Sequence, residues 1–196
     1  MKVLIIGATG TIGQAVTEKL ANHELILAGF DSGDVQVDLG DKASIQHMFE
    51  TVGKIDAIVS TAGVANFGPL AMQSDDDYAL ALNNKLMGQV NLVRVGKDYV
   101  NQGGSITLTS GMLSRHPMAG SASVSMVNGA LESFVKAAAL ELERLRVNVV
   151  APAFVKETMA KMGMDSTHGI SASDTAKTYV AAVEGDMTGK TLDVSR

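Results

Sequence analysis

The 196-residue chain contains no cysteine, no tryptophan, only 3 prolines and few aromatic residues. The lack of cysteine excludes a disulfide scaffold, a thiol nucleophile and a cysteine-ligated metal site, and no metal site is expected. Positive charge is also scarce, since 16 Lys and Arg residues stand against 21 Asp and Glu residues, for a formal net charge of −5. This balance argues against a general nucleic-acid binder or a binder of anionic membranes.

Long hydrophobic runs are missing as well. The apolar run nearest the start, Val3 to Ile6, ends at Gly7 after four residues, far fewer than a signal sequence or a membrane span requires. Apolar residues still make up 46% of the chain and charged residues 19%, as is typical of folded globular proteins. We therefore expect one soluble, cytoplasmic domain over residues 1–196.

Short apolar segments alternate with longer segments of helical spacing. The expected strands are Lys2–Ile6, Glu24–Ala28, Asp34–Val37, Ile55–Ser60, Ser105–Thr109, Val147–Val150 and Thr191–Val194. The expected helices are Ile12–Asn22, Lys42–Val52, Asp75–Val100, Ser123–Arg144 and Ser173–Glu184. The strands are continuously apolar, as parallel strands covered on both faces are. The pattern predicts an α/β fold, a doubly wound parallel sheet of about seven strands with helices on both faces.

A glycine-rich segment directly follows the first expected strand and opens the first expected helix. Gly7 permits a tight turn, Gly10 lets the backbone approach a pyrophosphate, and Gly13 lets the helix pack close to the sheet. Phosphates bind the free N–H groups at such a helix N-terminus. The strand before and the helix after favour a dinucleotide site over a glycine turn without a ligand. The cofactor contacts expected here are Gly7, Thr9, Gly10, Thr11, Ile12 and Gly13.

The ends of the third and fourth expected strands extend the same groove, because ligands of open parallel sheets bind outside the carboxyl ends of the strands. Asp38, followed by Leu39, can accept a hydrogen bond from an adenine amino group. Thr61 precedes Ala62 and Gly63, which leave room for a flat ligand against the backbone. Each of these residues alone is equally consistent with an ordinary loop, but together they outline one groove.

The segment after the second expected strand bears on the choice between NAD and NADP. An acidic residue there holds the ribose 2′-OH of NAD, whereas an arginine accommodates the 2′-phosphate of NADP. Here Gly29 is followed by Phe30, Asp31 and Ser32, with no basic residue. Asp31 favours NAD, and the Ser32 hydroxyl can donate to a phosphate. We expect NADP, with NAD as the alternative.

These features, in this order, resemble the short-chain dehydrogenase/reductase family over nearly the whole chain. The resemblance also rests on the segments Lys85–Gly88, Ile106–Ser110, Asn128–Leu131, Val147–Pro152 and Met187–Val194. It implies a single Rossmann-type domain, a nicotinamide cofactor and hydride transfer to or from a carbonyl or alcohol carbon. In the family a tyrosine is the acid/base, a lysine lowers its pKa and holds the ribose, a serine orients the carbonyl oxygen, and an asparagine joins a water relay.

Carried onto this chain, the family's serine falls on Ser110 and its lysine on Asn128. Its asparagine falls on Lys85, so lysine and asparagine are exchanged, as in the ketoreductase domains of polyketide synthases. The resemblance thus implies that Ser110, Lys85 and Asn128 are catalytic and that Lys85 also contacts the cofactor. An alternative alignment places the family's asparagine on Asn83 or Asn84 and leaves no lysine in the site. A further alternative is that Lys85 is a solvated helix lysine and Asn128 an ordinary buried polar residue.

The family's tyrosine position falls on Val124, so the resemblance implies a divergent member that lacks the usual catalytic tyrosine. Losing a positioned acid/base costs about 10²–10⁴ in rate. The candidates for its replacement are His116, Ser121, Ser123 and Ser125. Histidine is a residue type that can exchange protons near neutrality, although a histidine in a loop is more often an ordinary surface residue.

The substrate side begins at Pro152. The segment from Pro152 to Thr158 resembles the family turn that contacts the nicotinamide carboxamide, through the Val155 backbone and the Thr158 hydroxyl. The three methionines between residues 159 and 164 suit a short mobile lid, although methionine fills gaps in a core just as often.

The two longest expected helices resemble those of the family's four-helix dimer interface. Ala137–Ala139, Phe134 and Leu140 are the expected contacts, which implies a homodimer or homotetramer. The alternative is that both helices only cover the sheet.

The resemblance as a whole predicts an NAD(P)(H)-dependent oxidoreductase that acts on a small carbonyl or alcohol. From the acidic charge balance we expect no nucleic-acid or membrane partner. Val124 favours a different class, an NAD(P)(H)-binding sensor or scaffold with little or no catalysis. A third alternative is an enzyme similar to nucleotide-sugar epimerases, although the chain is short for their substrate domain.

Overall fold

The structure, a computed structural model, describes residues 1–194. Its centre is a seven-stranded sheet in the order β3-β2-β1-β4-β5-β6-β7, and all neighbouring strands are parallel. The strands are β1 Lys2–Ile6, β2 Glu24–Gly29, β3 Val35–Gln36, β4 Ile55–Ser60, β5 Val100–Thr109, β6 Arg146–Pro152 and β7 Thr191–Val194. The strand order reverses between β1 and β4, which confirms the predicted doubly wound sheet and places the ligand crevice at their carboxyl ends.

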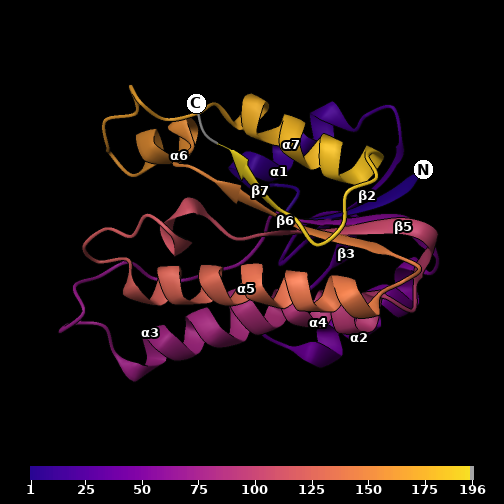
Figure 1. Cartoon of the computed structure of the whole chain (residues 1–196), viewed down its shortest axis with the longest axis horizontal. Helices are drawn as coiled ribbons and strands as arrows, with labels where there is room; N and C mark the ends of the chain where they lie inside the picture. Colours follow the sequence, from indigo (N-terminus) through magenta and orange to yellow (C-terminus); the bar gives the residue numbers. More distant parts are fainter. Residues whose placement is uncertain (195–196) are drawn as a thin grey trace.

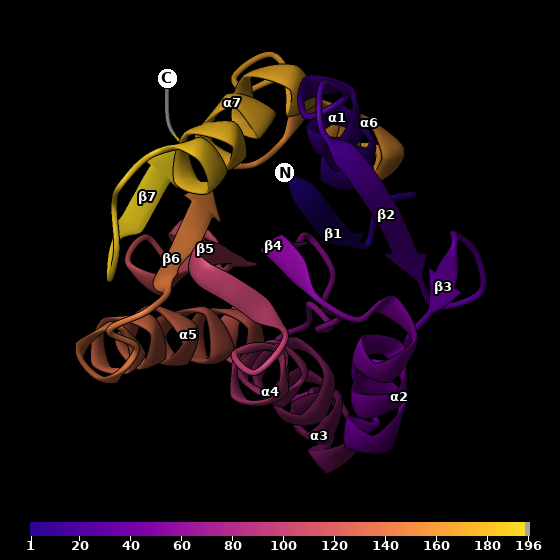
Figure 2. The same cartoon turned by 90° about the vertical axis from the view of Figure 1, so that its right-hand side faces the viewer.

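Helices cover both faces of the sheet, as predicted. They are α1 Thr11–Lys19, α2 Lys42–Val52, α3 Asp75–Leu80, α4 Met87–Gly96, α5 Ala122–Glu141, α6 Lys156–Lys161 and α7 Ala172–Glu184. Figure 2 shows α1 and α7 on one side of the sheet and α2, α4 and α5 on the other. In Figure 1 the loops that follow the strands gather at the end of the molecule where α3 and α6 lie.

Alternate residues of each strand enter two hydrophobic cores. In β1, Leu4 and Ile6 pack with α2, α4 and α5, whereas Val3 and Ile5 pack with α1 and α7. All four side chains are at most 1% exposed. Because both faces are buried, the strands need apolar residues at successive positions, and this explains the continuous apolar runs in the sequence.

Several elements begin or end one to five residues away from their predicted bounds, and two differ in more than their ends. The expected helix Asp75–Val100 consists of α3, a π-helical turn at Ala81–Leu86, and α4, which ends at Gly96. Val100 belongs instead to β5, where it pairs with Ile55 of β4 across an irregular register. The short helix α6 is absent from the prediction, since six residues are too few to show helical periodicity.

Within residues 1–194, none of the helices combines the length and the apolar character needed to cross a lipid bilayer.

Candidate cofactor and catalytic site

The glycine turn has the geometry that a pyrophosphate site requires. Gly7 has a φ of +81°, a left-handed conformation that favours glycine. Gly10 is the N-cap of α1, and no side chain caps this helix, so its first N–H groups are free for an anion. A Cβ on Gly13 would lie 2.0 Å from the Gly7 carbonyl oxygen, so a side chain there would push α1 away from the turn. The segment therefore fits a bound dinucleotide.

A cavity of about 320 Å³ continues from this turn toward the end of β2 and the π-helical turn at Ala81–Leu86. Its walls are Ile6, Gly7, Phe30, Val37, Leu39, Ala62, Gly63, Val64 and Asn84. The structure thus brings together five expected contacts from the ends of four strands, namely Gly7, Phe30, Leu39, Ala62 and Gly63. Asp38 lies beside this wall, and its Oδ1 accepts from the Gly40 N–H at 2.8 Å. Asp31, exposed, and Ser32, half-buried, belong to the loop after β2 and do not line this cavity.

A second cavity, of about 360 Å³, lies where β5 and β6 end. Its walls are Ile12, Lys85, Ser110, Gly111, Met112, Leu113, His116, Val124, Asn128, Pro152, Ala153, Phe154, Val155 and Thr158. We call it the catalytic cavity. The three expected catalytic residues meet in its wall, although they lie on three different segments of the chain. Ile12, from the first turn of α1, joins this cavity to the glycine turn.

Lys85 reaches the catalytic cavity from the π-helical turn between α3 and α4. Such turns recur at functional sites because the extra residue re-aims the side chains. Among residues 1–194, none forms a hydrogen bond or ion pair with the Lys85 ammonium, and burial lowers the pKa of this group to about 8. A Cβ on Gly63 would lie 3.0 Å from Lys85 Cγ, so the glycine leaves room for the lysine stem. The half-buried Lys85 is therefore a partly desolvated cation that has no partner among the residues that the structure describes.

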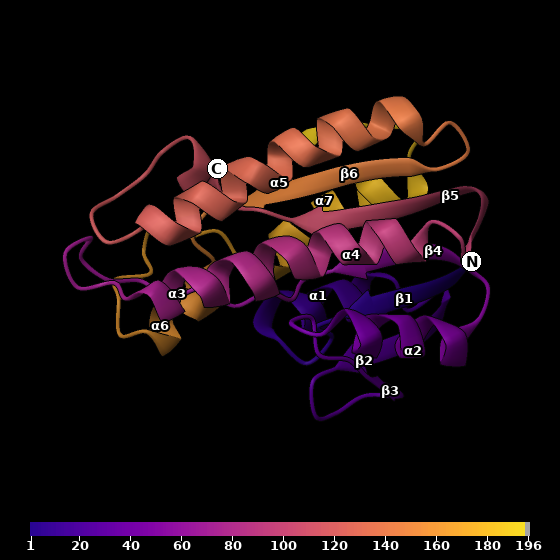
Figure 3. The same ribbon diagram turned by 90° about the horizontal axis from the view of Figure 1, so that it is seen from below.

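Asn128 faces the cavity from α5, which runs alongside α3 and α4 (Figure 3). Its Nδ2 donates to the Gly111 carbonyl oxygen at 3.5 Å, a long contact. Its Oδ1 is buried and accepts no hydrogen bond from the residues that the structure describes. Because an unsatisfied buried acceptor is costly, this oxygen is suited to a ligand hydroxyl or N–H group.

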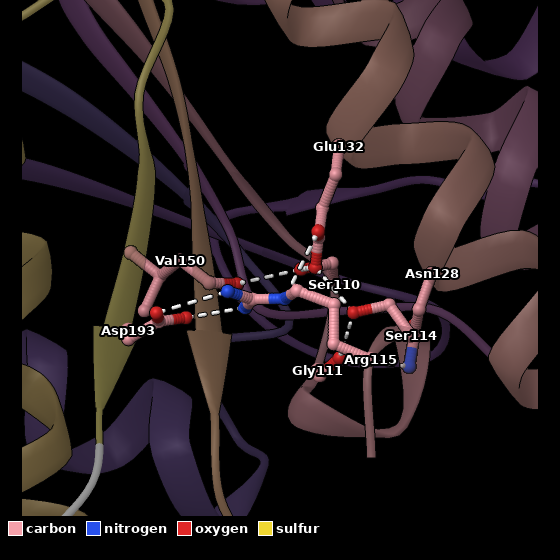
Figure 4. Close-up of polar contacts among 8 residues, drawn as sticks. All are labelled: Ser110, Gly111, Ser114, Arg115, Asn128, Glu132, Val150 and Asp193. Atoms are coloured by element: carbon pink, nitrogen blue, oxygen red, sulfur yellow. Dashed lines mark hydrogen bonds and ion pairs between the residues drawn. The ribbon is translucent and has the colours of Figure 1, made fainter. Parts of the chain in front are cut away.

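The Ser110 hydroxyl belongs to a polar network that extends behind the cavity (Figure 4). Ser110 Oγ donates to Glu132 Oε1 at 3.1 Å, and Ser114 Oγ donates to the same oxygen at 2.6 Å. Arg115 Nε lies 3.4 Å from Glu132 Oε2, and the Arg115 guanidinium also binds both carboxylate oxygens of Asp193. This pairing raises the pKa of Arg115 and lowers the pKa of Asp193.

The candidates for replacing the tyrosine occupy different places. His116 lines the catalytic cavity. Ser121 and Ser125 are hydrogen-bonded to each other, with 2.9 Å between their hydroxyl oxygens. Ser123 donates to the Asn66 carbonyl oxygen at 3.0 Å. The three serine hydroxyls thus take part in contacts at the start of α5.

The tyrosines of the chain lie in three separate regions. Tyr78 is half-buried on α3, and the Tyr99 ring stacks on Phe49 with centroids 5.3 Å apart. Tyr179 is fully buried on α7, where its Oη lies 2.7 Å from Thr109 Oγ1. Burial raises the pKa of Tyr179 well above its usual value.

Sequence reasoning did not identify Glu132, Arg115 and Asp193, whose contacts join distant segments. The one available signal is the spacing of Asn128 and Glu132, which stand four residues apart and so share a helix face. It also did not identify Lys161 on α6, whose Nζ donates to Thr11 Oγ1 at 2.9 Å.

Comparisons with known proteins agree with this geometry. The family model described as "Enoyl-(Acyl carrier protein) reductase" matches residues 7–186. The 3-oxoacyl-[acyl-carrier-protein] reductases of Homo sapiens and Mus musculus are 27% and 28% identical, over 181 and 131 residues. These matches cover 80% and 65% of this chain, and 76% and 56% of the relatives. The chain therefore spans about half to three quarters of the length of these curated relatives.

Two solved structures match over nearly their full length. The protein lin1944 from Listeria innocua is 42% identical, with a TM-score of 0.95 and 99% of each chain covered. A small-chain dehydrogenase in complex with NADPH is 30% identical, with a TM-score of 0.88, and the match covers 100% of this chain and 96% of that one. With the strand order, the glycine turn and the family match in agreement, the chain belongs to the short-chain dehydrogenase/reductase family.

Proposed function

We propose that the protein is an NAD(P)(H)-dependent oxidoreductase that moves a hydride between a nicotinamide cofactor and a small carbonyl or alcohol substrate. The observation that carries this proposal is the catalytic cavity, in which Lys85, Ser110 and Asn128 meet beside Ile12 of the phosphate-binding helix. Family membership supports it, and so do relatives that are named as reductases and a dehydrogenase.

We propose NADP as the preferred cofactor and NAD as the alternative. A 30% identical small-chain dehydrogenase has been solved with NADPH, and the Ser32 hydroxyl can donate to a 2′-phosphate. Asp31 favours NAD. Gly10 and the free N–H groups after it would hold the pyrophosphate, and Phe30 and Leu39 would flank the adenine.

The bound nicotinamide would give a hydride to the substrate carbon or take one from it. During reduction, negative charge develops on the carbonyl oxygen, and the Lys85 ammonium would stabilise this charge from its half-buried place in the cavity wall. Asn128 Oδ1 would accept a hydrogen bond from a ribose or substrate hydroxyl. Ser110 would hold the substrate oxygen, and Pro152 and Val155 would close the nicotinamide end of the cavity.

We further propose that the chain lacks a catalytic tyrosine. Val124, with an alkyl side chain, lies in the cavity wall, and Tyr179 forms its hydrogen bond with Thr109 inside the core. Val124 also favours the second candidate function, an NAD(P)(H)-binding sensor or scaffold with little or no catalysis. Both functions predict cofactor binding, and turnover separates them.

The substrate proposed is small and largely apolar. Besides the polar groups at its centre, the cavity presents Met112, Leu113, Val124 and Phe154. Its volume of about 360 Å³ must hold the nicotinamide ring as well as the substrate. The short helix α6 leaves little chain to form a larger binding surface.

The proposed assembly is a homodimer or homotetramer that uses α4 and α5. Ala137 and Leu140 are exposed on α5, whereas Phe134, Ala138 and Ala139 pack against the chain's own core. The cytoplasmic location stays a prediction from the sequence.

The first experiment is a titration of the protein with NADPH and NADH, followed by assays with small aldehydes, ketones and quinones. Gly10→Glu would place a carboxylate in the pyrophosphate site. The variant is expected to fold because Gly10 has a φ of −73° that other residues also adopt. We expect it to abolish cofactor binding, while Ala21→Glu, which adds the same charge beyond the end of α1, retains it. Equal affinity in wild type and Gly10→Glu would contradict the assigned site, and binding without turnover on any compound would favour the sensor.

A further inference from the structure

A buried carboxylate lies directly behind the catalytic cavity. Glu132 stands one helical turn after Asn128 on α5 and is 6% exposed. Its Oε1 accepts hydrogen bonds from Ser110 Oγ, 3.1 Å away, and from Ser114 Oγ, 2.6 Å away (Figure 4). An ionised carboxylate only accepts hydrogen bonds, so Ser110 is the donor in its contact with Glu132. The lone pairs of the Ser110 oxygen are then left for a ligand in the cavity.

Glu132 belongs to a cluster of three charged groups. Arg115 is the cation that faces Glu132, and it also binds Asp193. Two carboxylates therefore share one guanidinium, and the cluster carries a net charge of −1 that a single proton neutralises. When Glu132 is protonated, Asp193 still pairs with Arg115, so no charge is left unpaired. The other titratable groups on this side are Lys85 and His116, in the cavity wall.

We propose that Glu132 accepts and returns the proton of the reaction through the Ser110 hydroxyl, in place of the family's phenol. In alcohol oxidation, the substrate O–H bond breaks and its proton passes to Ser110 Oγ, while the Ser110 proton passes to Glu132 Oε1. A bound oxidised nicotinamide would supply the hydride acceptor, so that the substrate carbon would become a carbonyl carbon. In reduction, both transfers reverse. The inference rests on the proposed function, and Glu132 acts through Ser110 without touching the substrate.

Glu132→Gln separates proton transfer from simple positioning. The glutamine amide oxygen still accepts from Ser110, but the side chain does not titrate. We expect kcat for alcohol oxidation to fall about 100-fold or more, with KM and cofactor affinity close to the wild-type values. The wild-type rate falls at low pH as Glu132 becomes protonated, and the variant loses this dependence. Glu141→Gln, on the same helix but exposed, is the matched control and keeps the wild-type rate and pH profile.

A Ser110→Ala variant tests the proton relay independently of changes at Glu132. It removes the relay hydroxyl without altering the buried charges. Because the two groups act in series, we expect the double variant Ser110→Ala/Glu132→Gln to be no slower than the slower single variant. Rate losses that multiply would overturn the relay.

Infrared spectroscopy tests the interaction between Ser110 and Glu132 without requiring catalytic turnover. The difference between the spectra of wild type and Glu132→Gln isolates the carboxylate band of Glu132, which is followed against pH. The Ser110 hydrogen bond stabilises the ionised form, so Ser110→Ala is expected to move the midpoint to higher pH. An unmoved midpoint, or a Glu132→Gln variant with wild-type kcat and pH profile, overturns the relay. A wild type that turns over no compound contradicts the proposed function instead, even if the midpoint moves.

Discussion

The Lys85 ammonium lies in a cavity wall and has no partner among residues 1–194, so its charge destabilises the folded protein. The pKa of Lys85 is about 8 in the folded protein, against an ordinary value of 10.5. At pH 7 the ammonium is charged both in the folded and in the unfolded chain, but only the folded chain bears the cost of desolvating it. Lys85→Met keeps a similar apolar stem and removes the charge. We expect it to raise the free energy of unfolding by about 1–3 kcal/mol at pH 7, measured by chemical denaturation without cofactor.

The pH dependence of the stability gained by Lys85→Met identifies the cause of that gain. Since the pKa of Lys85 is lowered on folding, the unfolded chain binds more protons between about pH 8 and 10.5, and wild-type stability recovers over this window as the pH rises. The advantage of Lys85→Met is thus fully present below pH 8 and shrinks steadily above it. Lys136→Met, at an exposed position of α5, is the control and is expected to change little. A gain of equal size at pH 7 and pH 10 would contradict the burial of a charged lysine.

Some residues of the candidate site can be predicted from the sequence alone, and others cannot. Gly7 and Gly13 are predictable because the constraint on each lies within the same short segment of seven residues. Glu132 is not predictable in the same way, because its partners Ser110 and Arg115 lie 22 and 17 residues away and come together only through the packing of α5 against β6 and the 3-10 turn Met112–Ser114. Asp193 is still more distant, 78 residues from Arg115. Local geometry leaves a signal in the sequence, whereas a network across elements does not.

At the scale of elements, α6 closes one side of the cofactor groove. Lys161 at its end donates to Thr11 in the first turn of α1, so its charge lies next to the proposed pyrophosphate site. We expect Lys161→Ala to weaken NADPH binding about threefold to tenfold, because an ammonium at a phosphate contributes a charge-assisted hydrogen bond. Calorimetric titration at low and at high salt measures the effect, which is expected to shrink as salt screens the pair.

The matched control for Lys161→Ala is Lys19→Ala. Lys19 stands in the last turn of α1, at the opposite end of the helix from the glycine turn, and its removal changes the net charge of the protein by the same amount. We expect no loss of affinity in this variant. Equal losses in both variants would mean that net charge alone, and not the place of Lys161, determines the effect.

Elements whose type follows from periodicity are predicted well, and those that depend on irregular backbone are not. The strand Thr191–Val194 has the predicted bounds, and the predicted strand Glu24–Ala28 is extended only by Gly29. The π-helical turn that carries Lys85 reads as ordinary helix in the sequence, because one additional residue in one turn barely alters the apolar spacing. The placement of Lys85 in the cavity was therefore implied by the family resemblance and not by any local pattern.

At the scale of the whole molecule, the sheet follows from the sequence because each element satisfies one simple rule. Strands buried on both faces are continuously apolar, the connecting helices carry apolar faces, and right-handed crossovers between parallel strands leave few arrangements. The position of the crevice follows in turn from the reversal of strand order between β1 and β4. The oligomeric assembly follows no such rule. In the sequence, a helix face that packs on a partner subunit resembles a helix face that covers the sheet.

The assembly is therefore tested through a residue that the chain's own core does not use. Leu140 on α5 is 84% exposed, and in a dimer through α4 and α5 this side chain would be buried against the partner. We expect Leu140→Glu to convert the assembly into monomers at micromolar concentration, as measured by size-exclusion chromatography with light scattering, because it places charge in an apolar contact. Leu70→Glu is the control, since Leu70 is 71% exposed on the loop before α3 and away from this face. A wild type that is already monomeric, or an assembly that Leu140→Glu leaves intact, would contradict the proposed interface, whereas dissociation by Leu140→Glu alone would place it on α5.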